Sequence, residues 1–318
     1  MSFSGTAKDE LARLREEKPC CRLAEIAALI RLDGTLQFGG RENWAIQVVT
    51  ENAAVARKLF NLARAELERP ADVTIRRKMR LRKNMSYLVR VYPKDRRDLT
   101  RLGILSEKGE WQTGVNRALI RSRCDKKAYL RGAFLAGGSV NNPERDYHLE
   151  IITNNLPLAK DLQTILRGFR LKAKISARKN SYVVYIKESE HIFEFLALVG
   201  AHQALFAFED ARILKGMRNQ VNRLTNCETA NLDKTVSAAV RQAENIRRIA
   251  GRGELALLPA GLREIAELRL ARPECTLKEL GEMLTPPVGK SGVNHRLRRI
   301  EEIANGLARK GGKNVSGD

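Results

Sequence analysis

The chain has 318 residues, of which 43% are hydrophobic, so it is long enough for two domains with cores of their own, or for three. Its formal net charge of +21 indicates a polyanionic partner, with nucleic acid as the first candidate and an anionic membrane surface as the second. No run of about eighteen apolar residues is present, and residues 1–17 are polar without a signal-peptide pattern. We therefore expect a cytoplasmic, nucleoid-associated protein without a membrane partner.

The distribution of basic residues favours nucleic acid over a membrane. Residues 165–187 contain seven Lys or Arg and no acid, and residues 76–101 contain eleven against two Asp. Both blocks lie in segments that alternate like strands, which predicts a folded basic surface rather than a disordered tail. No helical segment combines a broad apolar face with a lysine-rich one, as a membrane-surface helix would.

The cysteines show no metal-binding spacing. The five are Cys20, Cys21, Cys124, Cys227 and Cys275. They form no CxxC pair, and no His lies at ligand spacing from them. We expect reduced thiols, with no metal and no cofactor.

Along the chain, a pattern occurs twice at a spacing of about 100 residues. Residues 21–36 and 127–140 are each a helix-length apolar run that ends in Gly and continues into a short strand. Alternating segments follow, WAIQVVTEN at 44–52 and HLEIITNN at 148–155. Each ends in a Thr-polar-Asn step and leads into a further helical pattern.

A hairpin completes each copy. The tripeptide Arg-Lys-Asn stands at 82–84 and again at 178–180, where a turn is expected. Each copy is thus predicted to be helix–strand–strand–helix–strand–strand–helix, and the two copies to pack about a pseudo-twofold axis in an α+β domain. The two sheets would form a basic saddle that suits the phosphates of duplex DNA. Its predicted outward residues are Arg76, Lys78, Arg80, Arg90, Lys172, Lys174, Arg178 and Lys187.

The last third of the chain is predicted to be all-α. Residues 201–250 have helical periodicity without proline, and the polar stretch Thr225–Leu232 is predicted to interrupt them, with a new helix from Asp233 to Ala250. The predicted domains are 1–205 (repeats at about 20–105 and 116–205), a helical connector 206–228, and a C-terminal domain 229–318.

A helix-turn-helix is predicted at about 276–308. Thr276 and Glu279 form a capping-box pattern that starts a short helix. Pro286 and Pro287 then prevent its continuation, and Ser291 is a plausible N-cap for a second helix, Gly292–Ala304. The turn is longer than in the simplest helix-turn-helix, so we expect a variant form.

The second helix has the pattern of a recognition helix. Val293, Leu297 and Ile300 are spaced as a buried stripe, which turns the polar residues outward. Asn suits adenine and Arg suits guanine in the major groove. The candidate DNA contacts of this motif are Lys278, Lys290, Ser291, Asn294, His295, Arg296, Arg298 and Arg299. An ordinary amphipathic surface helix remains the alternative.

The two apolar runs resemble the LAGLIDADG motif of homing endonucleases, here at Ile26–Gly34 and Leu130–Gly138. The resemblance implies that the two motif helices pack together and that the acid before the final Gly of each helps to hold a catalytic divalent metal. The first copy keeps this acid as Asp33, a vestigial acid, whereas the second has Gly137. A lone carboxylate is a weak Mg²⁺ site, so we expect no nuclease activity.

The combination of this domain with the helix-turn-helix resembles the WhiA family of sporulation regulators. The segments that carry the resemblance are 131–139, 148–154 and 290–298. It implies a bacterial transcription regulator of sporulation or cell division that binds double-stranded DNA without cleaving it, with a sigma factor or RNA polymerase as a further partner and no small-molecule substrate. Two alternatives stay open: a metal-dependent endonuclease with an altered site, and a LAGLIDADG-like domain that docks a protein.

Overall fold

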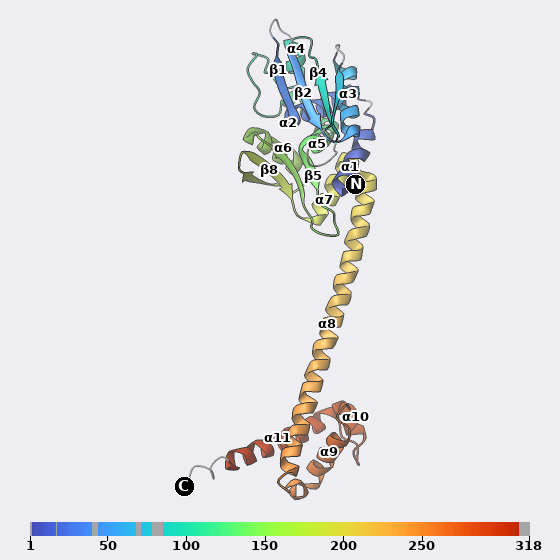
Figure 1. Ribbon diagram of the computed structural model, residues 1–318, viewed down its shortest axis with the longest axis vertical. Coiled ribbons are helices and arrows are strands. Elements are labelled where there is room, and N and C mark those ends of the chain that lie inside the picture. Colours follow the sequence, from blue (N-terminus) through green and yellow to red (C-terminus); the bar gives the residue numbers. More distant parts are fainter. Residues whose placement is uncertain (1, 17, 40–43, 68–70, 78–84, 312–318) are drawn as a thin grey trace. The chain divides into compact units, whose positions relative to one another are not determined.

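A computed structural model describes residues 2–16, 18–39, 44–67, 71–77 and 85–311. The chain divides into two compact units, 1–216 and 217–318, and each is described by itself (Figure 1). Helix α8 (His202–Ala250) contributes its first turns to one unit and the rest to the other. Among the described residues, no helix has the length and apolarity needed to cross a bilayer.

The first unit contains the predicted αββαββα repeat twice, after an N-terminal helix α1 (Phe3–Arg13). The first copy consists of α2 (Pro19–Asp33), β1 (Gly34–Phe38), β2 (Trp44–Thr50), α3 (Ala53–Glu66), β3 (Asp72–Arg77), β4 (Met85–Val91) and α4 (Arg96–Arg101). The second consists of α5 (Arg123–Gly137), β5 (Gly138–Val140), β6 (Leu149–Thr153), α6 (Leu156–Gly168), β7 (Lys174–Arg178), β8 (Ser181–Ile186) and α7 (Ser189–Val199), preceded by a 3-10 turn, Arg117–Ile120. The predicted α+β fold is confirmed.

Each copy forms one antiparallel sheet, with strand orders β1-β2-β4-β3 and β5-β6-β8-β7. The repeated Thr-polar-Asn step has the same role in both. Asn52 caps α3 by accepting hydrogen bonds from the N–H groups of Ala54 and Val55, and Asn155 caps α6 by accepting one from Leu158. A short polar side chain at this point satisfies backbone donors that a helix start leaves open. The same local chemistry thus ends a strand and starts a helix twice.

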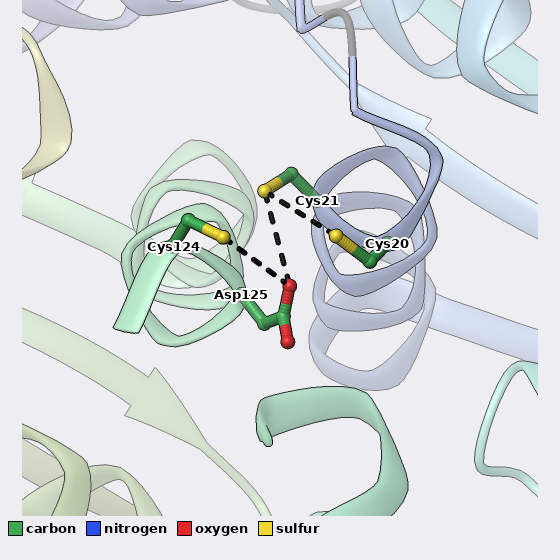
Figure 2. A group of neighbouring side chains, drawn as sticks. All are labelled: Cys20, Cys21, Cys124 and Asp125. Atoms are coloured by element: carbon green, nitrogen blue, oxygen red, sulfur yellow. Dashed lines mark hydrogen bonds between the residues drawn. The ribbon is translucent and has the colours of Figure 1, made fainter. Parts of the chain in front are cut away.

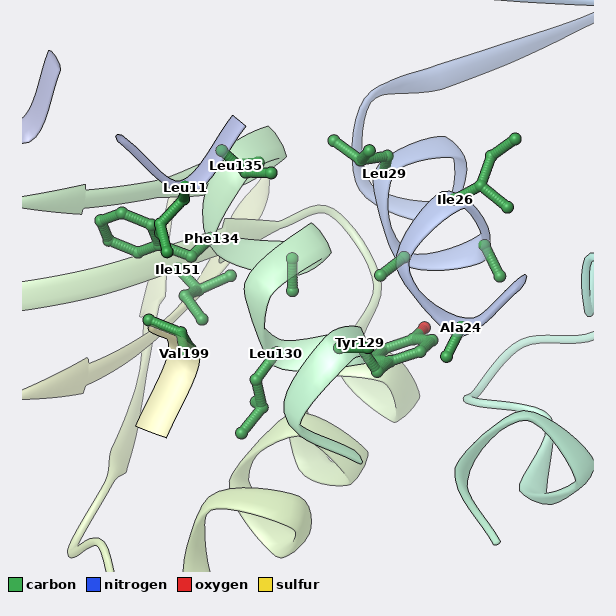
Figure 3. Packing of buried hydrophobic residues seen from close by; sticks show 14 of the residues in the cluster. Leu11, Ala24, Ile26, Leu29, Tyr129, Leu130, Phe134, Leu135, Ile151 and Val199 are labelled. Carbon is green, nitrogen blue, oxygen red and sulfur yellow. The ribbon is translucent and has the colours of Figure 1, made fainter. Parts of the chain in front are cut away.

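The two copies are joined by α2 and α5, which pack against each other along their length (Figure 3). Both helices are part of the hydrophobic core of the first unit. Its almost fully buried residues include Ala24, Ile26 and Leu29 of α2 and Tyr129 and Leu130 of α5. The close approach depends on Gly132, because a Cβ there would lie 2.3 Å from the Glu25 carbonyl oxygen. The helices run parallel: Cys21 meets Asp125 near their first turns, and Leu32 lies against Gly137 at their last.

In the second unit, the C-terminal part of α8 packs with η2 (Leu255–Leu257), α9 (Ala260–Ala271), α10 (Leu277–Glu282) and α11 (Lys290–Gly311). The predicted interruption at Thr225–Leu232 is wrong, since α8 continues through it. These side chains are exposed all round, and the stretch has neither Gly nor Pro, so polarity alone does not end a solvated helix.

Three predicted features of the first repeat, Lys78, Arg80 and the turn at 82–84, lie outside the described residues. The matching turn of the second repeat is present: β7 ends at Arg178, and Lys179 has a positive φ of 52° before β8 begins at Ser181.

Candidate nucleic-acid interface

The helix-turn-helix is built around the start of α10. Thr276 accepts a hydrogen bond from the Glu279 N–H (3.3 Å), and Glu279 accepts one from the Thr276 N–H (2.7 Å), so the predicted capping box is present. These bonds lower the pKa of the Glu279 carboxyl. The buried Arg269 of α9 donates to the carbonyl of Cys275 (2.7 Å) and fixes the segment that enters the cap.

The turn between α10 and α11 requires Gly281. The Val288 N–H donates to the Gly281 carbonyl at 2.9 Å, and a Cβ on Gly281 would clash with the Val288 carbonyl oxygen. The prediction that Ser291 caps α11 is wrong, because the helix begins at Lys290 and the Gly289 carbonyl accepts the Val293 N–H (3.1 Å). Ser291 lies in the first helical turn instead, one residue after the helix begins.

Helix α11 buries the predicted stripe. Val293, Leu297 and Ile300 are at most 2% exposed and join the core of the second unit. On the opposite side are four exposed residues, Ser291, His295, Arg298 and Arg299. At 100° per residue, Ser291 and His295 lie close to the line furthest from the core, and Arg298 and Arg299 flank that line on either side. This is the side that a major groove would meet.

A second group of α11 residues faces a groove of about 440 Å³ beside α8. Lys290, Asn294 and Arg298 line it from α11, and Lys234 and Arg241 line it from α8. Arg241 also pairs with Glu301 at 3.6 Å. The sequence pattern does not single out Lys234 and Arg241, because only the tertiary fold brings this stretch of α8 beside α11.

Other candidates of the motif already have protein partners. Arg296 is half-buried and donates to the Gly261 carbonyl at 3.4 Å. Arg299 pairs with Glu302 at 2.6 Å, and Lys278 with Glu282 at 3.8 Å, both on the surface. Exposed ion pairs of this kind are weak, so Arg299 and Lys278 can still bind a phosphate.

The sheets carry the remaining basic candidates on their outer faces, the faces turned away from α3 and α6. Cross-strand pairing places Lys174 opposite Tyr185 and Arg178 opposite Ser181, while Ile175, between them, pairs with the buried Val184. Lys187 follows β8 in the same alternation. In the first sheet, Arg76 pairs with Ser86 and Arg90 with Gln47, on its outer face.

Acidic residues interrupt this basic surface. Lys172 precedes β7 and pairs with Glu188 at 3.7 Å. Glu150 stands on the outer face of β6 and accepts a hydrogen bond from Ser139 (3.2 Å), with His148 at 3.1 Å. Among the described residues, the basic candidates of the second sheet for which no ion pair is seen are therefore Lys174, Arg178 and Lys187.

In this chain, the two positions that correspond to the acids of a LAGLIDADG nuclease are not suited to hold a catalytic divalent metal. Asp33 ends α2, and burial raises the pKa of its carboxyl although the Lys8 ammonium opposes that shift. Lys8 donates to the Ala136 carbonyl at 3.2 Å, so a protein cation already lies between the two motif ends. At the matching position of α5, a Cβ on Gly137 would lie 2.5 Å from the Ile152 carbonyl oxygen, which leaves no room for a second acid.

Comparison with known proteins identifies the parts of the chain. A family model described as the WhiA N-terminal LAGLIDADG-like domain matches residues 19–105. The WhiA LAGLIDADG-like domain matches 126–218, and the WhiA C-terminal HTH domain matches 221–304.

Relatives of similar length carry the same family name. The "Probable cell division protein WhiA" of Desulfitobacterium hafniense (strain DSM 10664 / DCB-2) is 60% identical over 318 residues, covering 98% of this chain and 100% of the relative. That of Brevibacillus brevis (strain 47 / JCM 6285 / NBRC 100599) is 50% identical, covering 99% and 100%. The crystal structure of full-length DUF199/WhiA from Thermatoga maritima has a TM-score of 0.57 at 26% identity, covering 96% of this chain and 98% of that one.

Proposed function

This chain belongs to the WhiA family, and from that premise we propose that it is a bacterial transcription regulator that binds double-stranded DNA through α11. The observation that carries the proposal is the face of α11, which buries one apolar stripe and presents Ser291, His295 and Arg298 outward. A helix of this form, preceded by a capped helix and a fixed turn, fits the major groove of B-form DNA.

The charge of the chain supports a second mode of contact. Lys174, Arg178 and Lys187 on the second sheet, with Arg76 and Arg90 on the first, would contact phosphates without reading sequence. Lys290, Lys234 and Arg241 would do the same beside α11. Base reading would then fall to Asn294, His295 and Arg298, and backbone attraction to the remaining basic residues.

The proposed biological role is the control of cell division or sporulation genes, and the names of the relatives support cell division. Binding near promoters would place a sigma factor or RNA polymerase within reach as a partner, and it implies a cytoplasmic, nucleoid-associated protein. We propose that the chain does not cleave DNA, because Lys8 stands beside the lone Asp33 and Gly137 admits no second acid.

Mapping the DNA bound by the full-length protein across its host genome tests the proposal. We expect enrichment at discrete sites that share a sequence and lie upstream of genes. Bound DNA spread evenly over the genome, without enriched sites, would contradict sequence-specific binding. Incubation of supercoiled plasmid with the protein and Mg²⁺ or Mn²⁺ should leave the plasmid intact, and cleavage that disappears in Asp33→Asn would overturn the non-enzymatic assignment.

A further inference from the structure

Three of the five cysteines meet where α2 and α5 begin (Figure 2). Cys20 and Cys21 lie in the first turn of α2, and Cys124 and Asp125 lie in the first turn of α5. The four potential ligand atoms, three sulfurs and one carboxylate oxygen, all lie within 4.8 Å of one another. Residues about 100 positions apart in sequence thus form one cluster, which cysteine spacing along the chain does not reveal.

The distances within the cluster match a tetrahedral metal site. The sulfurs of Cys20 and Cys21 are 4.0 Å apart, and Asp125 Oδ1 lies 3.9 Å from Cys21 Sγ and 3.7 Å from Cys124 Sγ. Four ligands at zinc–sulfur bond length occupy a tetrahedron whose edges are about 3.8 Å. The side chains therefore need only small movements to enclose one ion.

Asp125 is held in place for this role. Its Oδ2 accepts the Ser122 N–H at 2.9 Å in the capping box of α5, and this leaves Oδ1 directed at the thiols. Cys21 is buried, whereas Cys20 is exposed, so the cluster is formed within the protein but open to solvent on one side. An ion can enter from that side and then be shielded by the helices.

The two helix starts also favour the negative charge that thiolate ligands carry. The first turns of α2 and α5 lie at the positive ends of their helix dipoles. Each thiol that binds an ion releases its proton to solvent.

We propose that Cys20, Cys21, Cys124 and Asp125 bind one soft divalent cation of the zinc class. The ion would link the first turns of the two helices that join the repeats, at the end opposite Asp33 and Gly137. Its role would be structural, because all four positions are filled by protein ligands, as in closed zinc sites. The proposal does not depend on DNA binding and can fail or hold independently of it.

Cobalt titration of the reduced, metal-stripped full-length protein tests the site. We expect one Co²⁺ per chain, with thiolate-to-cobalt charge-transfer and tetrahedral ligand-field bands that Zn²⁺ then abolishes by displacement. Both bands should be lost or strongly reduced in Cys124→Ser and Cys20→Ser. They should persist in Cys227→Ser and Cys275→Ser, whose cysteines lie in the second unit.

Thermal unfolding provides a second readout. Zn²⁺ should raise the melting temperature of the wild type and of Cys227→Ser, and it should leave that of Cys20→Ser unchanged. Cys20 is exposed, so this variant is expected to fold like the wild type in the absence of metal. Absence of cobalt bands in the reduced wild type, or bands that survive in Cys124→Ser, would overturn the proposal. The proposal would also be overturned if the protein bound no cobalt and instead formed a disulfide between Cys124 and Cys20 or Cys21. The cluster would then be a site of thiol redox chemistry.

Discussion

Arg131 of α5 holds Glu25 of α2 through two hydrogen bonds, from Nε to Oε1 at 3.0 Å and from Nη2 to Oε2 at 3.1 Å. Glu25 is completely buried, and Lys58 of α3 lies 3.2 Å from its Oε1. Burial lowers the pKa of the Arg131 guanidinium, but the carboxylates of Glu25 and Glu16 outweigh this and hold it above its ordinary value. One guanidinium thus ties the two repeats together across their shared helix pair.

Arg131→Met should therefore destabilise the first unit. The change leaves Glu25 buried with Lys58 as its remaining cation, and breaking a buried pair in this way costs about 3–5 kcal/mol. Both tryptophans, Trp44 and Trp111, lie in the first unit, so their fluorescence during urea unfolding follows this unit alone. Arg97→Met, which removes an exposed pair with Asp95, is the matched control and should change the midpoint little. Equal midpoints for the two variants would contradict the assigned role of Arg131.

Gly132→Ala should also destabilise the first unit, because its Cβ would lie 2.3 Å from the Glu25 carbonyl oxygen and 2.9 Å from the Ala28 Cβ. Forcing α2 and α5 apart costs about 1–3 kcal/mol, as overpacking of a core does. Gly168→Ala at the end of α6 is the control, since nothing lies within 4 Å of its added Cβ. Tryptophan fluorescence serves again, and a neutral Gly132→Ala would show that the helices are not in contact at this point.

The repeat was predictable because local patterns determine it. The Thr-polar-Asn steps at 50–52 and 153–155 have a local chemical role that the sequence shows directly. The Asp33 environment, the groove that includes Lys234 and Arg241, and the meeting of Cys20 with Cys124 depend on tertiary packing. The start of α11 was misplaced because Ser291 is a good N-cap residue, but the backbone is already helical at Lys290.

Thr276→Ala should destabilise the second unit by about 1 kcal/mol, the usual cost of losing an N-cap. Folding lowers the pKa of the Glu279 carboxyl. The ionised carboxylate therefore stabilises the folded state above the ordinary pKa of a Glu carboxyl, and this stabilisation is lost as the pH falls through the lowered pKa. Circular dichroism melts of Glu279→Gln and the wild type should therefore differ at neutral pH and converge in acid. A difference that persists unchanged in acid would contradict the capping-box interpretation.

Removal of basic residues from the second sheet should weaken DNA binding without changing its sequence preference. If Lys174 and Arg178 each contact a phosphate, the double change to Gln should reduce the slope of log K against log salt by about 0.9 per contact. Lys108→Gln, an exposed residue of the same charge elsewhere in the first unit, is the control and should leave the slope unchanged. If the wild type and both variants had equal slopes of log K against log salt, Lys174 and Arg178 would not contact DNA.

The Arg298→Ala variant shows whether α11 reads base sequence. Binding of the wild type and the variant should be measured on a mapped cognate site and on a scrambled duplex at one salt concentration. We expect a loss of about 1–3 kcal/mol on the cognate site and a much smaller loss on the scrambled duplex, so the specificity ratio falls. Equal losses on both duplexes would show that Arg298 contacts only phosphate and would contradict the claim.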